Sequence, residues 1–171
     1  MKALITGASS GLGKDMARYL SSLGYDLILV ARRKTYLENL KKELSTNVKI
    51  IPYDLAVQDN LDNLWNEVKD EDVDLLVNNA GFGLFGEFDK TDLDREFEMI
   101  DVNIKALHYL TKKFLIKFKK EGKGRILNVA SSAGFMAGPK LSTYYASKNY
   151  VLRLSEAIYE ELRVAKSNLH I

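Results

Sequence analysis

Apolar residues along the chain follow two alternating patterns. Short continuous apolar runs between polar residues are typical of strands buried on both faces, and they occur at 2–6, 25–31, 48–53, 73–78 and 124–130. Longer segments with apolar residues three or four positions apart are typical of amphipathic helices. They run from a glycine-rich turn through Leu23 and over 34–45, 58–70, 93–120 and 143–166. The last residues, NLHI, have the pattern of the first step of a sixth strand.

Strands that alternate with helices predict an α/β fold, a doubly wound, Rossmann-like parallel sheet with helices on both faces. The length of 171 residues, with no linker or repeat, predicts a single domain over 1–171. Ligands of such sheets bind beyond the carboxyl ends of the strands. We therefore expect functional residues directly after Thr6, Ala31, Tyr53, Asn78 and Ala130.

Composition removes several classes of function. A net charge of +2 without a basic stripe argues against a nucleic-acid partner, and the basic run at 112–125 is typical of a solvated helix end. The absence of cysteine excludes disulfides and thiolate chemistry, and the two histidines lack a carboxylate at ligand spacing, so no metal site is expected. No apolar run is long enough to span a membrane and no signal peptide precedes the first strand, which predicts a cytoplasmic protein.

The turn TGASSGLG (6–13) follows the first strand and opens a helix. Glycines there let the backbone approach a pyrophosphate, whose charge meets the amides at the start of the helix. This predicts a dinucleotide site that includes Gly7, Ser9, Ser10, Gly11, Leu12 and Gly13. The alternative is a glycine-rich turn that binds no ligand.

The residues at the end of the second strand indicate whether the ribose of such a dinucleotide carries a 2′-phosphate. An acid usually lies there when the 2′-phosphate is absent, but no acid occurs between Asp26 and Glu38. Arg32 and Arg33 occupy the position, and a guanidinium binds phosphate bidentately. NADP(H) is therefore predicted over NAD(H), the alternative being a surface pair of arginines.

Several motifs in one order resemble those of the short-chain dehydrogenase/reductase family: TGASSGLG, DLA (54–56), NNAG (78–81), Asn103, Ser131 and Tyr144-xxx-Lys148. The resemblance covers essentially the whole chain. It implies that Asp54 holds the adenine ring and that Leu55 contacts it through its backbone. It also implies that the NNAG segment, with Asn79, Ala80 and Gly81, buttresses the sheet beside the cofactor, and that Asn103 is the catalytic asparagine.

Two tyrosine–lysine pairs share the same four-residue spacing, Tyr144 with Lys148 and Tyr109 with Lys113. Ser131 precedes Tyr144 by thirteen residues, which is the family's spacing, and follows the fifth predicted strand. The residue thirteen positions before Tyr109 lies inside a predicted helix and does not follow a strand. We therefore interpret Tyr144 and Lys148 as the functional pair.

Reduction of a carbonyl requires a hydride, which a nicotinamide supplies, and a proton. A free tyrosine titrates near pH 10, so it needs a nearby positive charge to act at neutral pH. Lys148, one helical turn from Tyr144, can stabilise the phenolate form by its charge. Tyr144 is thus predicted as proton donor and acceptor, with Ser131 holding the substrate oxygen. The resemblance implies that Lys148 also bonds the nicotinamide ribose and that Asn103 orders a water that relays protons through Lys148.

The substrate is less determined. Phe85, Phe135, Met136 and Leu141 lie in loops after the fourth and fifth strands, where they line either an apolar pocket or the core or an interface. A hydrophobic ketone or aldehyde, or the matching alcohol, fits better than a charged sugar phosphate. Surplus apolar residues in the helices at 92–120 and 143–166 predict a homo-oligomer like family members that pair through these helices, unless they bury against the sheet.

The sequence departs from the family at its end. Family members continue through further strands and a helix pair that covers the substrate, whereas this chain stops at His170 and Ile171. We expect a sheet truncated after the helix that follows strand five, with an exposed edge. The alternative function is therefore a dinucleotide-binding or interaction module with weak or no turnover.

Overall fold

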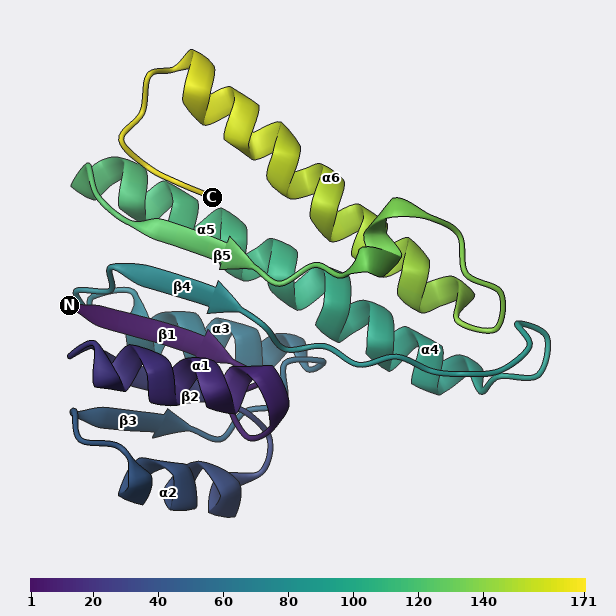
Figure 1. The fold of residues 1–171 in the computed structure, drawn as a ribbon, viewed down its shortest axis with the longest axis horizontal. Helices are drawn as coiled ribbons and strands as arrows, with labels where there is room; N and C mark the ends of the chain where they lie inside the picture. Colours follow the sequence, from purple (N-terminus) through teal and green to yellow (C-terminus); the bar gives the residue numbers. More distant parts are fainter.

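The computed structural model describes residues 1–171 and confirms the predicted fold class, a parallel sheet with helices on both faces (Figure 1). Five strands pair in the order β3-β2-β1-β4-β5. Every strand falls within its predicted range: β1 (Lys2–Thr6), β2 (Asp26–Val30), β3 (Val48–Ile51), β4 (Leu75–Asn78) and β5 (Arg125–Asn128). All four pairings are parallel, so the carboxyl ends of the strands meet at one edge.

The helices also follow the predicted order. They are α1 (Gly11–Ser22), α2 (Lys34–Glu43), α3 (Gln58–Val68), α4 (Leu93–Ile100), α5 (Leu107–Glu121) and α6 (Ser142–Val164). Two short elements were not predicted, the π-helix η1 (Asp101–Ala106) and the 3-10 helix η2 (Ser132–Phe135). None of the helices combines the length and apolarity that crossing a membrane requires.

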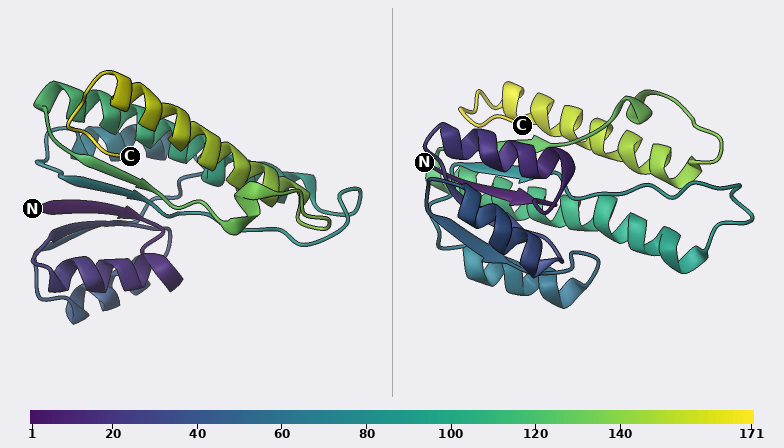
Figure 2. Two further views of the ribbon diagram at one scale, coloured as in Figure 1. Left: turned by 45° about the horizontal axis from the view of Figure 1, so that its top comes forward. Right: turned by 60° about the horizontal axis from the view of Figure 1, so that its bottom comes forward.

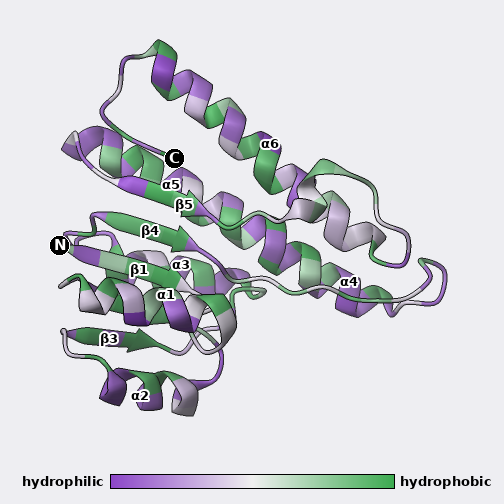
Figure 3. Cartoon of the chain, viewed as in Figure 1, coloured by the Kyte–Doolittle hydropathy of each residue, from purple (hydrophilic) through white to green (hydrophobic).

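Alternating strand residues divide the core into two layers. Ala3 and Ile5 of β1 pack with apolar residues of α1 and α2, whereas Leu4, between them, packs with α3 and α5 on the opposite face. Successive side chains of a strand point to opposite faces, so one apolar run supplies both layers. Figure 2 shows the helices in layers on the two sides of the sheet, and Figure 3 shows the strands as largely hydrophobic beneath helices of mixed character.

The free edge of β5 is partly covered by the last residues of the chain. Arg125 forms an isolated parallel bridge with His170, and the Ile126 amide donates to the His170 carbonyl at 2.9 Å. The prediction that NLHI begins to pair as a sixth strand is therefore confirmed. The rest of the β5 edge carries no strand partner.

The long helix expected over 93–120 is interrupted by η1, which lies between α4 and α5. A π-turn holds an extra residue, which shifts the apolar stripe by about 100° relative to an unbroken α-helix. Leu110 and Phe114 of α5 are fully buried, whereas Leu93 and Phe97 of α4 are 61% and 54% exposed. The expectation of one unbroken α-helix is wrong at this segment, and α4 extends beyond the carboxyl ends of the strands (Figure 1).

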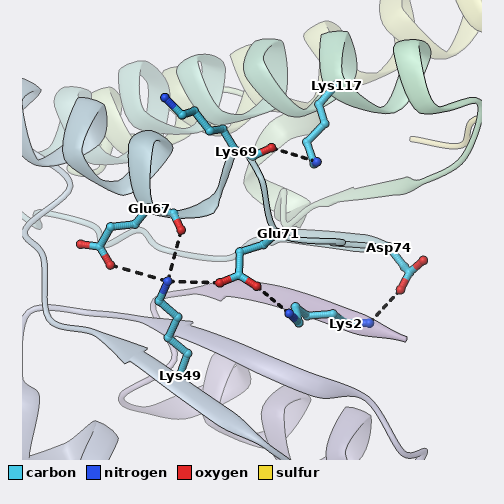
Figure 4. Close-up of polar contacts among 7 residues, drawn as sticks. All are labelled: Lys2, Lys49, Glu67, Lys69, Glu71, Asp74 and Lys117. Atoms are coloured by element: carbon cyan, nitrogen blue, oxygen red, sulfur yellow. Dashed lines mark hydrogen bonds and ion pairs between the residues drawn. The ribbon is translucent and has the colours of Figure 1, made fainter.

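An ion-pair network joins elements at the opposite, amino-terminal edge of the sheet (Figure 4). The Glu71 carboxylate accepts from Lys2 Nζ at 2.6 Å and from Lys49 Nζ at 3.3 Å. Lys2 begins β1, Lys49 lies in β3, and Glu71 lies in the turn between α3 and β4. The hydrogen bond from Lys2, with a smaller contribution from Lys49, lowers the pKa of Glu71.

Replacement of Glu71 tests this network. Because the folded-state pKa of Glu71 is depressed, its stabilising contribution is present above the ordinary pKa of a glutamate and disappears as the pH falls through the folded value. Glu71→Gln should lower the free energy of unfolding by up to about 1 kcal/mol at neutral pH and have no effect in acid, as measured by urea denaturation. Asp70→Asn, an exposed neighbour outside the network, is the control. A Glu71→Gln deficit that persists unchanged in acid would contradict the assignment.

Candidate active site

A cavity of about 550 Å³ lies at the carboxyl edge of the sheet. The predicted dinucleotide-binding residues line it, except for Gly13, Tyr144 and Lys148. The complete lining is Gly7, Ser9, Ser10, Gly11, Leu12, Ala31, Arg32, Arg33, Tyr53, Asp54, Leu55, Asn79, Ala80, Gly81, Phe82 and Val102. The fold thus brings segments that follow β1, β2, β3 and β4 around one volume.

The floor of this cavity is fixed by hydrogen bonds between the ends of β1 and β4. The Thr6 hydroxyl accepts from the backbone amides of Asn79 and Ala80, each at 3.0 Å. The Asn79 side-chain amide in turn donates to the carbonyls of Thr6 at 3.1 Å and Gly7 at 3.3 Å. A Cβ on Gly13 would overlap both the Asn79 amide and the Gly7 carbonyl, so Gly13 supports the turn from behind instead of lining the cavity.

The start of α1 has the features of an anion site. Ser10 is the N-cap, yet no side chain caps the helix and its first turn contains no acid. Gly11 has a φ of +51°, and a Cβ there would meet open space. The first amides of a helix have no intrahelical partner and carry partial positive charge, so the residues present fit a pyrophosphate.

The two arginines after β2 have different partners. Arg32 Nη1 donates to the Glu98 carboxylate at 2.7 Å and lies 3.7 Å from an Asp54 oxygen. Arg33 Nη2 donates to the Ser9 hydroxyl at 3.2 Å, and its guanidinium lies 4.2 Å from the centre of the Tyr36 ring. Arg33 therefore has no carboxylate partner, whereas Arg32 has two.

Asp54 is held in place by its own loop. One of its carboxylate oxygens accepts from the Ala56 amide at 3.0 Å, and its carbonyl accepts from the Asn60 side chain at 3.0 Å. Its other oxygen is the one near Arg32. The carboxylate thus lines the cavity in an orientation set by the backbone of the DLA segment.

Four lining residues were not among the predicted site residues. Ala31 and Tyr53 are the residues at the ends of the predicted strands, so the strand pattern already contained the signal for them. Phe82 and Val102 have no comparable signal, because they reach the cavity through contacts between the loop after β4 and the π-helix η1.

Asn103 connects the cavity to α6. Its side-chain amide donates to the Phe82 carbonyl at 2.9 Å and to the Ser147 hydroxyl at 3.1 Å, while its oxygen accepts from the Phe82 amide at 3.0 Å. A Cβ on Gly81 would lie only 2.9 Å from the Asn103 oxygen and 3.6 Å from Lys148 Nζ. Gly81, which has no side chain, therefore lies between the cavity and Lys148.

Lys148 and Tyr144 of α6 approach the loop after β4 at Gly81 and Gly83, and Ser131 lies in the segment after β5. Lys148 is buried, donates to the Val129 carbonyl at 2.8 Å, and its Nζ lies 5.9 Å from the centre of the Tyr144 ring. Burial lowers the pKa of Lys148. Ser131 follows the β5 end, and its hydroxyl accepts from the Ala133 amide at 3.1 Å.

The segment that carries Ser131 lies directly on the helix that carries Tyr144. A Cβ on Gly134 would come within 2.9 Å of the Lys148 carbonyl, and the Asn149 side chain donates to the Gly134 carbonyl at 2.8 Å. The glycine in the S-x-x-G pattern thus permits close contact between η2 and α6. The exposed Ser132 makes no side-chain hydrogen bond, whereas Ser131 is half-buried.

The second tyrosine–lysine pair has a different environment. The Tyr109 hydroxyl donates to the Asp62 carboxylate at 2.6 Å, and Lys113 Nζ lies 5.3 Å from the centre of the Tyr109 ring. Burial and this hydrogen bond raise the pKa of Tyr109 to about 12, which opposes loss of its proton. Tyr109 also lies outside the cavity.

The loops beyond the site expose large apolar side chains. Phe85, Phe135 and Met136 are 73%, 67% and 62% exposed, whereas Leu141 is half-buried near Gly83, against which the Tyr144 ring packs. Phe85, Phe135 and Met136 therefore do not lie in the core, which leaves a pocket or an interface as their predicted place.

Known proteins resemble this chain in both sequence and structure. A family model described as short chain dehydrogenase matches residues 1–169. An uncharacterized oxidoreductase from Staphylococcus epidermidis is 32% identical over 94% of this chain, which spans 70% of that protein. A short-chain dehydrogenase from Sphingobium yanoikuyae in complex with NADPH is 32% identical with a TM-score of 0.91, covering 98% of this chain and 67% of its own. A metagenomic short-chain oxidoreductase in complex with NADP is 31% identical with a TM-score of 0.91, covering 99% and 79%.

The burial of Lys148 should make the free energy of unfolding depend on pH. A lysine with a depressed folded-state pKa binds fewer protons when folded than when unfolded, so its burial cost is greatest at low pH and fades as the pH approaches its ordinary pKa of 10.5. Between neutral and alkaline pH, wild type should therefore gain stability relative to Lys148→Met, as measured by denaturant titration at each pH.

Lys123→Met is a control of opposite sign. The hydrogen bond to Asp72 raises the pKa of the exposed Lys123, so its small contribution is present at neutral pH and disappears as the pH rises. A Lys148→Met difference that does not change with pH would contradict the proposed environment of the buried ammonium.

Proposed function

Because the chain belongs to the short-chain dehydrogenase/reductase family, whose members are oxidoreductases, we propose that it interconverts a carbonyl and an alcohol with NADP(H). Residues 1–171 act as one NADP-binding, Rossmann-like unit in this proposal. When bound, the nicotinamide supplies or accepts the hydride, and the chain contributes binding, orientation and proton transfer.

One observation carries the proposal. Gly81 lines the same cavity as the glycine turn, the arginines and Asp54, and a Cβ on Gly81 would lie 3.6 Å from Lys148 Nζ. Lys148 follows Tyr144 by one helical turn, and its Nζ lies 5.9 Å from the Tyr144 ring. The candidate dinucleotide cavity and an acid–base candidate thus meet at a glycine, as a reaction between a dinucleotide and a small carbonyl requires.

Each residue has a distinct role in this proposal. The Tyr144 hydroxyl gives a proton to the substrate oxygen, or removes it in the reverse direction, and Lys148 supplies the positive charge that favours its ionised form. Ser131 donates a hydrogen bond to the same oxygen. Asn103 holds the Phe82 backbone in place through a pair of hydrogen bonds. In this proposal it also orders a water that relays protons through Lys148.

The surroundings favour an apolar substrate. Phe85 and Phe135 are exposed in the loops after β4 and β5, on the side where Tyr144 lies. A hydrophobic ketone or aldehyde buries more apolar surface there than a charged sugar phosphate. Exposed Phe97 of α4 and Val164 of α6 similarly favour association through these helices.

Substitution of the two tyrosines tests the assignment. In protein expressed from its complete reading frame, Tyr144→Phe should lower turnover of a panel of hydrophobic ketones by roughly 10²- to 10⁴-fold, because the proton donor is lost. NADPH affinity, measured by nicotinamide fluorescence, should stay close to that of wild type. Tyr109→Phe is the matched control and should retain turnover.

Retained turnover in Tyr144→Phe, or equal losses in both variants, would overturn the catalytic role of Tyr144. If the wild-type protein binds NADPH but turns over no carbonyl, the alternative of a dinucleotide-binding module is favoured instead.

The cofactor preference is tested at the arginines. Arg33→Ala should weaken NADPH binding by roughly 10- to 100-fold and leave NADH binding nearly unchanged, because a hydrogen-bonded charge contact to the 2′-phosphate is lost. Arg32→Ala should have a smaller effect, since the carboxylates of Glu98 and Asp54 already neutralise Arg32. Calorimetric affinities for both dinucleotides decide the question. Equal weakening of NADPH and NADH would show that neither arginine reads the phosphate.

A further inference from the structure

Glu96 is a buried carboxylate outside the residues considered so far. It lies in α4, is 7% exposed and takes part in no ion pair, although the chain contains many lysines and arginines. A buried charge without a cation is costly unless hydrogen bonds compensate it. We infer that Glu96 is a positioning residue that fixes the first turn of α6 and thereby the hydroxyl of Tyr144. This inference rests on the function proposed above.

Two threonine hydroxyls satisfy the carboxylate from different segments. Thr91, in the loop before α4, donates to one Glu96 oxygen, and Thr143 donates to the other at 3.0 Å. Thr143 is the residue directly before Tyr144 in α6. One side chain therefore connects the loop after β4 to the first turn of the helix that carries the proposed acid–base residue.

The start of α6 lacks the features that usually stabilise a helix N-terminus. Its N-cap is Leu141, no side chain caps it, and its first turn contains no acid. Such a terminus has unpaired amides and partial positive charge, which a nearby anion stabilises. Glu96 supplies this negative charge from another helix, through its contact with Thr143.

The loop after β4 is bound to the same region from the other side. The Gly86 amide donates to the Lys140 carbonyl at 2.8 Å, and Gly83 packs against the Tyr144 ring. The ring therefore lies between the loop that Thr91 holds and the helix turn that Thr143 holds. Loss of the Glu96 contacts would free both supports of the ring, and a displacement of about 1 Å can reduce turnover by about 100-fold.

A matched pair at position 143 gives the sharpest test. Thr143→Val removes the hydroxyl at nearly constant shape, whereas Thr143→Ser keeps it. Thr143→Val and Glu96→Gln should lower kcat by roughly 10- to 100-fold with little change in NADPH affinity, and Thr143→Ser should restore kcat. Asp94→Asn, an exposed residue of the same helix with no side-chain hydrogen bond, is the control.

Amide hydrogen exchange provides a readout that does not depend on turnover. In Thr143→Val and Glu96→Gln, the amides of residues 145–148, the first in α6 that can have helical acceptors, should exchange faster than in wild type, whereas the rest of α6 should be unchanged. Unchanged exchange there, or a normal kcat in Thr143→Val, would overturn the inference. A wild-type protein that turns over no carbonyl would count against the proposed function, while the exchange data would still decide whether Glu96 holds the turn.

Discussion

The hydrogen bonds between Thr6 and the Asn79–Ala80 segment are the contact on which the site depends. They fasten the loop after β1 to the loop after β4, at the point where adjacent parallel strands end side by side. The contact is close enough to require glycine at positions 7 and 13, because a Cβ at either would collide with the Asn79 side chain or the Ala80 backbone. The same closeness brings the uncapped start of α1 over the cavity, where it can meet an anion.

A second set of contacts connects this cavity to Tyr144. Asn103, Gly81 and Lys148 lie in sequence-distant segments, yet they meet within a few ångströms. The connection costs stability, since it buries a lysine whose pKa is lowered by desolvation. In the proposed mechanism this arrangement places a positive charge beside the Tyr144 phenol, and the burial of Lys148 strengthens the effect of that charge.

Much of the fold and the outline of the site could be predicted from apolar periodicity and strand ends. Parallel strands have to place their carboxyl ends together, so residues after Thr6, Ala31 and Asn78 share an edge whatever the loops do. The π-helix η1 could not be predicted, because apolar residues recur at intervals of three and four positions throughout 93–118, as they do in an unbroken α-helix. The turn around Asn103 instead accompanies bonds to Phe82 and Ser147, which lie 21 and 44 positions away in the sequence. The contact between Glu96 and Thr143 could not be predicted either, because these residues lie 47 positions apart in the sequence.

The π-helix η1 also has a consequence for how this sequence can change in length. A single-residue deletion within 101–106 would restore α-helical geometry and leave the orientation of α4 nearly unchanged, because the π-turn is one extra residue held without rotation of its flanks. By contrast, a single-residue insertion in α5 would turn η1 and α4 by about 100° relative to the rest of α5. That rotation would move Glu96 away from Thr143 and carry the neighbouring Phe97 toward the interior, while Val102 would leave the cavity wall. Surface loops absorb insertions and deletions at low cost. Here one codon gained in α5 would disturb the proposed nucleotide and proton-transfer sites together, so the π-turn is the place where this helix can change length without rotating α4.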